Sequence, residues 1–251
     1  MRRYLKAEGL KFRHSLFYRL ILGIPAMVIA ASLALLYIGM GVGGFAGLLV
    51  CNWCMPMASV SVALLCHLVN NKEKKQEYRT LYSLPIDFRK TFLAKSCLVA
   101  GNLLAASAVL ALAGIAAEGI WTGQTIPFGR AVFTLLGYSV LWLSLLWQIP
   151  FCLVLERRFG WIGSVLISLS GSGLGGVFFA LTPLFWMFPH SWTARLMMTL
   201  FGILPSGMPV QQGAGYLMEP EETLLLLTAA LGVFFLLLLL SAHRYGREVK
   251  E

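Results

Sequence analysis

Two of the five cysteines in this chain have the spacing of a redox motif. Cys51 and Cys54 enclose an asparagine and a tryptophan, which gives the Cys-X-X-Cys pattern of thiol–disulfide chemistry. That chemistry needs a thiolate in a polar setting near the start of a helix. Because both residues lie inside a long apolar segment, the sequence favours free thiols packed among apolar side chains.

A metal site in the same segment is also disfavoured. Cys51, Cys54 and His67 would supply three ligands, but His67 lies 13 residues from Cys54. That separation is about 20 Å along a helix, so the segment would have to fold back on itself. None of the other three histidines has a second histidine or a carboxylate at ligand spacing, and we expect no metal site.

The chain lacks the motifs of several enzyme classes. Glu221 and Glu222 are similar to the paired glutamates of intramembrane CAAX-type proteases, but residues 223–227 lack the arginine that this chemistry needs. There is no Gly-X-Ser-X-Gly elbow and no His-Glu-X-X-His run. No lysine follows a glycine, so there is no P-loop. We expect no catalytic residue, and any use of ATP must then depend on a partner.

The composition indicates what kind of secondary structure contains the cysteines, the histidines and the paired glutamates. Of the 251 residues, 58% are apolar and only 12% are charged, whereas a soluble domain has about a quarter charged residues. This excludes a soluble enzyme, a disordered chain and a nucleic-acid-binding domain. Six segments without Asp, Glu, Lys or Arg are long enough to cross a bilayer as helices: 20–40, 45–69, 96–117, 131–155, 161–188 and 223–242.

The basic residues fix the expected orientation. Eighteen of the 20 lysines and arginines fall before the first span, after the second and fourth spans, or in the tail 243–251. Only Arg130 and Arg195 fall on the other side. Because basic loops stay in the cytoplasm, the sequence predicts an all-α membrane protein with both termini inside. The net charge of +9 then faces anionic lipid, and no nucleic acid is needed to explain it.

Residues 1–19 are predicted to form an amphipathic helix in the inner membrane interface, ahead of the transmembrane domain 20–242. Its apolar side carries Leu5, Phe12 and Leu16, and its basic side carries Arg2, Lys6 and Arg13. The alternative is a plain basic flank of the first span.

The segment 70–95 is the only sizeable loop on the cytoplasmic side. Tyr78, Leu81 and Tyr82 have the i, i+3, i+4 spacing of an apolar cluster on a short helix, which Leu84 and Pro85 end. A short helix with aromatic residues between two spans suits docking into a groove of a cytoplasmic partner. The alternative is a solvated basic loop whose aromatic residues lie on the membrane surface.

Polar and small residues within the spans are the candidates for a cavity or a helix interface. They are Asn52, Pro56, Gln148, Ser168, Ser172 and Gly176. The last three belong to a stripe of small residues in the fifth span, which favours close helix packing over a hinge. The outer segment 189–222 is partly apolar and is expected to form short helices or a re-entrant segment, broken at Pro205 and Pro209.

Taken together, these features resemble the permease subunit of a type-2 ABC exporter, and within that class the lantibiotic-immunity permeases. The residues that carry the resemblance are Lys6-Ala-Glu8, Lys11, Asn52-Trp53, Glu73-Lys74-Lys75, Tyr78-Arg79, Leu84-Pro85 and Ala94-Lys95. The architecture that carries it is a basic interfacial helix, six spans, a helical loop after the second span and a long outer segment before the sixth.

The resemblance implies a multi-pass protein of the bacterial cell membrane that works in a complex. Two permease chains, identical or paralogous, would pair with two cytoplasmic ATPase subunits that bind ATP and Mg²⁺. Tyr78, Arg79, Leu81, Tyr82, Leu84 and Pro85 would couple ATP hydrolysis to the export of an amphipathic peptide from the bilayer. Two other functions stay open, namely export of another drug, peptide or lipid-linked compound, and a non-transporting membrane sensor or scaffold.

Overall fold

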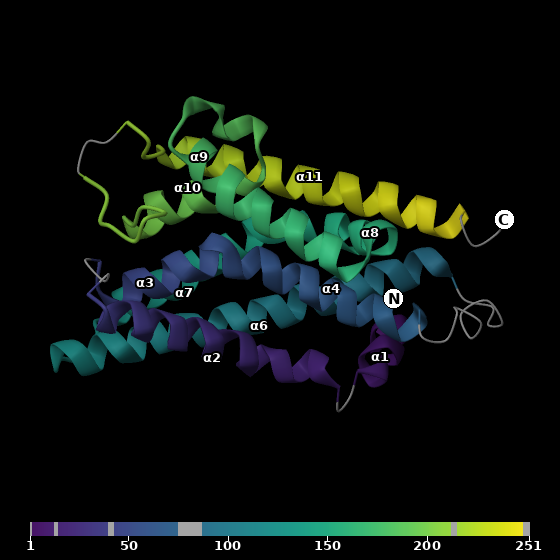
Figure 1. Ribbon diagram of the computed structural model, residues 1–251, viewed down its shortest axis with the longest axis horizontal. Helices are drawn as coiled ribbons and strands as arrows, with labels where there is room; N and C mark the ends of the chain where they lie inside the picture. The colour runs from purple at the N-terminus through teal and green to yellow at the C-terminus, as the bar shows by residue number, and fades with distance from the viewer. Residues whose placement is uncertain (1, 13–14, 40–42, 75–86, 212–214, 248–251) are drawn as a thin grey trace.

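Helices that run side by side along one axis make up the described part of the chain (Figure 1). The computed structural model describes residues 2–12, 15–39, 43–74, 87–211 and 215–247. Within these ranges there is no β-strand, and β pairing is limited to one isolated bridge between Ile203 and Pro209. The predicted all-α class is confirmed for the residues that the structure describes.

The segments without charged residues are mostly helical, as expected where lipid offers the backbone no hydrogen-bond partner. The elements are α1 (Arg2–Lys11), α2 (Leu16–Tyr37), α3 (Gly44–Asn52), η1 (Trp53–Met57), α4 (Ala58–Lys74), α6 (Phe88–Thr122), α7 (Phe128–Leu145), α8 (Gln148–Ser170), η2 (Gly171–Gly176), α9 (Val177–Ala180), η3 (Pro183–Met187), α10 (His190–Phe201) and α11 (Pro220–Arg247). Six stretches are long and apolar enough to cross a membrane: Leu16–Tyr37, Gly44–Asn71, Phe88–Thr122, Phe128–Leu145, Gln148–Ala180 and Pro220–Arg244. This confirms a multi-pass membrane protein with six apolar helices.

The start of α1 and the end of α11 lie at the same end of the bundle as the end of α4 and the start of α6 (Figure 1). We call this end the loop end, because residues 75–86 join α4 to α6, and we call the opposite end the far end. Both ends of the chain therefore lie on one side, as six crossings require. That this side is the cytoplasm stays a prediction from the charge distribution.

The predicted fourth span, 131–155, is not one continuous helix. Helix α7 ends at Leu145 and α8 begins at Gln148. The reason is Pro150, which has no N–H and cannot continue the ladder of hydrogen bonds. The carbonyl of Leu146 accepts instead from the N–H of Ile149 at 3.0 Å. Pro150 then lies in the first turn of a new helix, where a missing N–H costs nothing.

Helix α8 folds back on itself at Gly160. This glycine has φ 71° and ψ −177°, a backbone conformation that residues with a Cβ rarely adopt. The Sγ of Cys152 lies 3.4 Å from the Oγ of Ser168, although 16 residues would separate them by about 24 Å along a straight helix. The fourth crossing therefore comprises α7 and residues 148–159, and the fifth begins at Trp161.

The predicted fifth span, 161–188, ends earlier than expected. Helix α9 stops at Ala180, and the extended backbone of Thr182 leads into the 3-10 turn η3, which begins at Pro183. The residue before a proline is held away from helical angles, so the helix cannot run on to Phe188.

The outer segment re-enters the bundle. His190, the first residue of α10, packs edge-on against Trp147 with ring centroids 4.8 Å apart. A Cβ on Gly171 would lie 2.7 Å from the ring of His190, so this close approach requires glycine. Gly171 lies 11 residues, roughly 16 Å of helix, from the turn at Gly160. Helix α10 therefore begins near the middle of the bundle.

From that depth α10 runs to the far end, where Ile203 packs against Gly47 of α3. It ends at Gly202, which takes the left-handed conformation of a helix C-cap. The outer segment is expected to form either short helices or a re-entrant segment, and the structure shows a short helix that is also re-entrant. The helix breaks at Gly202 rather than at the predicted Pro205.

We predict that Gly160→Ala lowers the stability of the protein by about 1–3 kcal/mol, because alanine is strained at this φ and ψ. The matched control is Gly101→Ala in α6, where φ is helical and a Cβ would meet no atom within 4 Å. Thermal unfolding in detergent measures both. Equal unfolding temperatures for the two variants would show that the turn at Gly160 does not depend on glycine.

Candidate functional site

The predicted coupling residues lie outside the described residues. These are Tyr78, Arg79, Leu81, Tyr82, Leu84 and Pro85, and the predicted interfacial residue Arg13 is also outside. The structure does describe the two helices that carry the segment, α4 and α6, and how each is held at the loop end. The candidate functional site is therefore this pair of anchors.

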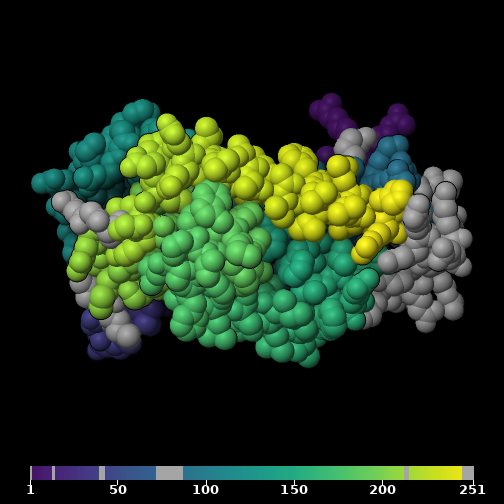
Figure 2. All heavy atoms as spheres, turned by 90° about the horizontal axis from the view of Figure 1, so that it is seen from above, coloured from purple at the N-terminus to yellow at the C-terminus, as the bar shows by residue number. Residues whose placement is uncertain are grey.

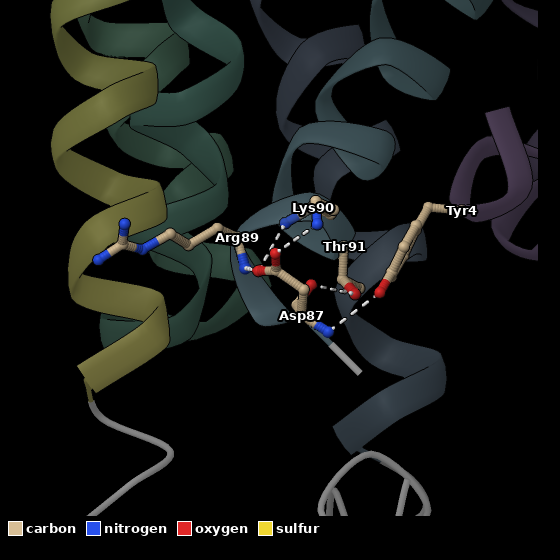
Figure 3. A network of polar contacts seen from close by, with 5 residues as sticks. All are labelled: Tyr4, Asp87, Arg89, Lys90 and Thr91. Atoms are coloured by element: carbon tan, nitrogen blue, oxygen red, sulfur yellow. Dashed lines mark hydrogen bonds and ion pairs between the residues drawn. The ribbon is translucent and has the colours of Figure 1, made fainter. Parts of the chain in front are cut away.

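The first anchor is the start of α6, where Asp87 is the N-cap (Figure 3). The Oδ1 of Asp87 accepts a hydrogen bond from the backbone N–H of Arg89 at 3.1 Å, and its Oδ2 lies 3.0 Å from the Nζ of Lys90. The backbone N–H of Asp87 donates to the hydroxyl of Tyr4 on α1 at 3.1 Å. Residue 87, which directly follows the joining segment, is thereby held by its own helix and by α1.

The same turn of α6 also reaches α11. The Nη2 of Arg89 lies 2.9 Å from the Nδ1 of His243, and Figure 3 shows the Arg89 side chain extending toward the α11 ribbon. The hydrogen bond from Lys90 is the main cause that holds the pKa of Asp87 below its ordinary value. Asp87 is therefore charged at neutral pH, and the start of α6 is joined to two other helices.

The second anchor joins the end of α4 to the part of α8 before the turn at Gly160, residues 148–159, which we call the first limb of α8. The contact is made around a buried carboxylate. Glu156 is only 3% exposed. Its Oε1 lies 3.1 Å from the Nδ1 of His67, and its Oε2 accepts from the Nδ2 of Asn70 at 2.7 Å. The same Asn70 amide donates to the carbonyl of Leu153 at 3.1 Å. A buried carboxylate needs such partners, because without them it would lose its water without compensation.

Sequence reasoning missed this second anchor. The predicted spans 131–155 and 161–188 leave Glu156 in the short connection between them, and His67 is considered only as a metal ligand. The available signal was that His67 and Asn70 are three residues apart and so share one face of an apolar helix, where polar side chains need a partner. Which helix supplies that partner depends on the turn at Gly160.

Helix α1 packs against α6, but it differs from the predicted helix over 1–19. It ends at Lys11, and Ser15 caps the separate helix α2. Phe12 is buried within the protein and Leu5 is half-buried, but Leu16 belongs to α2 and is exposed. Leu5 and Leu16 are therefore not on one continuous stripe.

The face that α1 buries is not purely apolar. Glu8 is 4% exposed and forms an ion pair with Lys11, and Lys95 of α6 is 1% exposed. Both charged residues lie in segments that the resemblance singled out. Burial of a carboxylate and an ammonium group suits a helix that packs on protein as well as on a membrane surface. The interfacial location of α1 stays a prediction.

The polar and small residues predicted for a cavity or helix interface lie in helix contacts. Asn52 donates to the hydroxyl of Ser32 on α2 at 2.9 Å, and Ser168 pairs with Cys152 across the turn at Gly160. Ser172 donates to the carbonyl of Ser168. These contacts favour the helix-interface alternative.

The other three candidates lie at irregular parts of the backbone. Gln148 is buried beside the break between α7 and α8. Pro56 lies in the kinked turn η1, where Met55 has extended backbone angles. A Cβ on Gly176 would lie 3.2 Å from the carbonyl oxygen of His190, so Gly176 gives α10 room to pack.

The cysteines show no arrangement for catalysis. Cys51 donates to the carbonyl of Pro205 at 3.3 Å, Cys66 donates to that of Ile149 at 3.6 Å, and all five thiols are free. Among the described residues no three His, Cys, Asp or Glu side chains lie close enough together to hold a metal ion.

A cavity of about 340 Å³ opens near the far end between α3, α6, α7 and α10. Its walls include Val50 and Phe201, and the hydroxyl of Tyr138 has no hydrogen-bond partner among the described residues. Glu118 and Arg130 form an ion pair in the lining. Apolar walls with a few polar groups suit an amphipathic ligand.

Comparisons of the chain with family models, with curated proteins and with solved structures found no match.

We predict that Asn70→Ala and Glu156→Ala are each destabilising, by about 1–3 kcal/mol, because each leaves a buried partner without its hydrogen bond. The double variant should cost clearly less than the sum of the two, since one change removes the reason for the cost of the other. Denaturation in detergent measures all four proteins. Strict additivity would mean that the two side chains do not interact.

We also predict that Asp87→Ala destabilises the start of α6 by about 1 kcal/mol, as loss of an N-cap does. Asp87→Asn keeps the cap but loses the charge. Because the pKa of Asp87 is lowered in the folded protein, the wild-type advantage over Asp87→Asn exists at neutral pH and falls as the pH drops through that lowered value. Unfolding measured at pH 7 and pH 3 would show this; a constant difference contradicts it.

Proposed function

We propose that this chain is the transmembrane permease subunit of an ATP-driven exporter. Its substrate in this proposal is a hydrophobic or cationic antimicrobial peptide of the lantibiotic type, which the complex expels from the membrane to give immunity or resistance. Two cytoplasmic ATPase subunits bind ATP and Mg²⁺, and two permease chains, identical or paralogous, form the pathway. The chain itself is not an enzyme.

The observation that carries this proposal is the attachment of residues 75–86 at both sides. On one side α4 is joined to α8 through Asn70 and Glu156, and on the other side α6 is joined to α1 and α11 through Asp87 and Arg89. A partner that moves this segment therefore acts on α4 and α6 and, through them, on three further helices, α1, α8 and α11. A loop without a mechanical role has no need of polar anchors at both sides, one of them around the buried carboxylate of Glu156.

The length of α6 supports the same function. Its 35 residues span about 52 Å, well beyond the ~30 Å of hydrocarbon in a bilayer. The helix therefore extends outside the membrane and carries motion from its start at the loop end to the far-end cavity, which Gly114 and Glu118 of the same helix line. The apolar walls of that cavity, with the Glu118–Arg130 ion pair in its lining, suit an amphipathic peptide.

The chain has no nucleotide-binding motif, so the energy must come from a partner. Affinity purification from a mild detergent, followed by mass spectrometry, is expected to recover a protein that has a P-loop. The purified chain alone is expected to hydrolyse no ATP. Hydrolysis by the isolated chain would overturn the proposal.

We predict that the double change Tyr78→Ala and Leu81→Ala reduces ATPase association at least tenfold, since small interfaces depend on a few aromatic and apolar anchors. The matched control is Ile120→Ala with Trp121→Ala, which removes two exposed apolar side chains at the far end of α6. Co-purification yields measure the effect. Association at the wild-type level in the loop variant would exclude docking through this segment.

A transport assay distinguishes peptide export from the two alternative functions. Vesicles that contain the chain and its ATPase are loaded with a fluorescent cationic amphipathic peptide in the membrane, and release is followed after addition of ATP. ATP-dependent release supports peptide export. ATP hydrolysis that a lipid-linked compound or a drug stimulates, but the peptide does not, indicates another exported substrate. A partner that binds without any ATP-dependent release indicates a sensor or scaffold.

A further inference from the structure

A second cavity, of about 300 Å³, lies at the loop end between the first limb of α8 and the end of α11. Its apolar walls include Val154 and Leu155 of α8 and Leu237 and Leu240 of α11. Figure 2 views the molecule from the side on which α11, in yellow, lies along the green residues of the fifth crossing. The cavity is distinct from the one near the far end.

The charged residues of this cavity all have one sign. Arg158 and Arg244 both contribute to its lining, and among the described residues the lining contains no Asp or Glu. Arg158 lies two residues before the turn at Gly160, and Arg244 lies near the end of α11, so both guanidinium groups belong to the loop end of the cavity. Both side chains are exposed. The hydroxyl of Ser241 adds a further possible donor.

The cavity is polar at one end and apolar along its length. From Arg244 back to Leu237 is seven residues, about 10 Å of helix. Leu240 is 53% exposed and Phe159 is 63% exposed, so the apolar part opens to the surroundings of the bundle, which in a membrane are acyl chains. A ligand that fits has an anionic group attached to an apolar chain.

We propose that this cavity binds one anionic phospholipid. The phosphate lies between Arg158 and Arg244, whose planar guanidinium groups match phosphate oxygens in pairs. The first part of an acyl chain lies over Leu237 and Leu240. Basic pockets between transmembrane helices on the cytoplasmic side are where anionic head groups bind, and the charge distribution predicts that the loop end is that side.

The bound lipid would connect two elements that belong to the anchors of the loop end. Arg158 follows the buried Glu156 by two residues, and Arg244 directly follows His243, which contacts Arg89. Occupancy is therefore expected to stabilise the first limb of α8 against α11. This inference depends on insertion in a membrane and not on ATP-driven export, so its failure would leave the proposed function untouched.

The test is native mass spectrometry of the full chain in detergent, titrated with phosphatidylglycerol, phosphatidylcholine or inorganic phosphate. We expect one phosphatidylglycerol bound in preference to phosphatidylcholine. The double variant Arg158→Gln with Arg244→Gln should bind phosphatidylglycerol roughly 10- to 30-fold more weakly. The control Arg3→Gln with Arg19→Gln removes the same charge from exposed loop-end positions outside the cavity, and its affinity should change less than about twofold.

A further variant separates the acyl site from the charges. Leu237→Trp fills the cavity and keeps both arginines, so it should also weaken phosphatidylglycerol binding. Equal binding of the two lipids, or equal loss of binding in the control, would overturn the proposal. Binding of inorganic phosphate as tightly as phosphatidylglycerol would also overturn it, because the occupant would then be a soluble anion.

Discussion

The structure depends on one constraint, which is that lipid forms no hydrogen bonds with the backbone. Two irregular parts of the backbone within the bundle are therefore packed against another part of the chain. The break before Pro150 is packed by the ring of His190 against Trp147, and the wide turn η2 is covered by the same histidine at Gly171. The first residue of the re-entrant helix α10 packs against both breaks, which explains why this helix begins in the middle of the bundle.

The same constraint governs polar side chains. Glu156 is buried, and its two oxygens face His67 and Asn70 from another helix. Such a pair fixes the register of α4 against α8 more strictly than apolar contacts do, because a shift of one turn would leave the carboxylate without partners. Specific polar contacts therefore hold the loop end, and in the proposed function it is also the end at which a cytoplasmic partner acts.

In the proposed function, the loop end is coupled to the ATPase and the far end binds the substrate. The loop end has hydrogen-bonded anchors on α4 and α6 and a basic cavity suited to an anionic lipid. The far end has a cavity with apolar walls that α6 and α10 help to line. Because α6 runs between the two ends, the proposed function predicts that displacement of its start changes the shape of the far-end cavity.

The sequence by itself determined the six apolar helices and their number, since length and hydropathy are local properties. It did not reveal that Glu156 is buried, that Leu16 begins a new helix, or that His190 packs beside Trp147. Those facts depend on which helices become neighbours, and that choice follows from the backbone at Gly160 and Pro150 together with side-chain packing over the whole bundle. Only the tertiary structure could decide them, because each involves partners far apart in the chain.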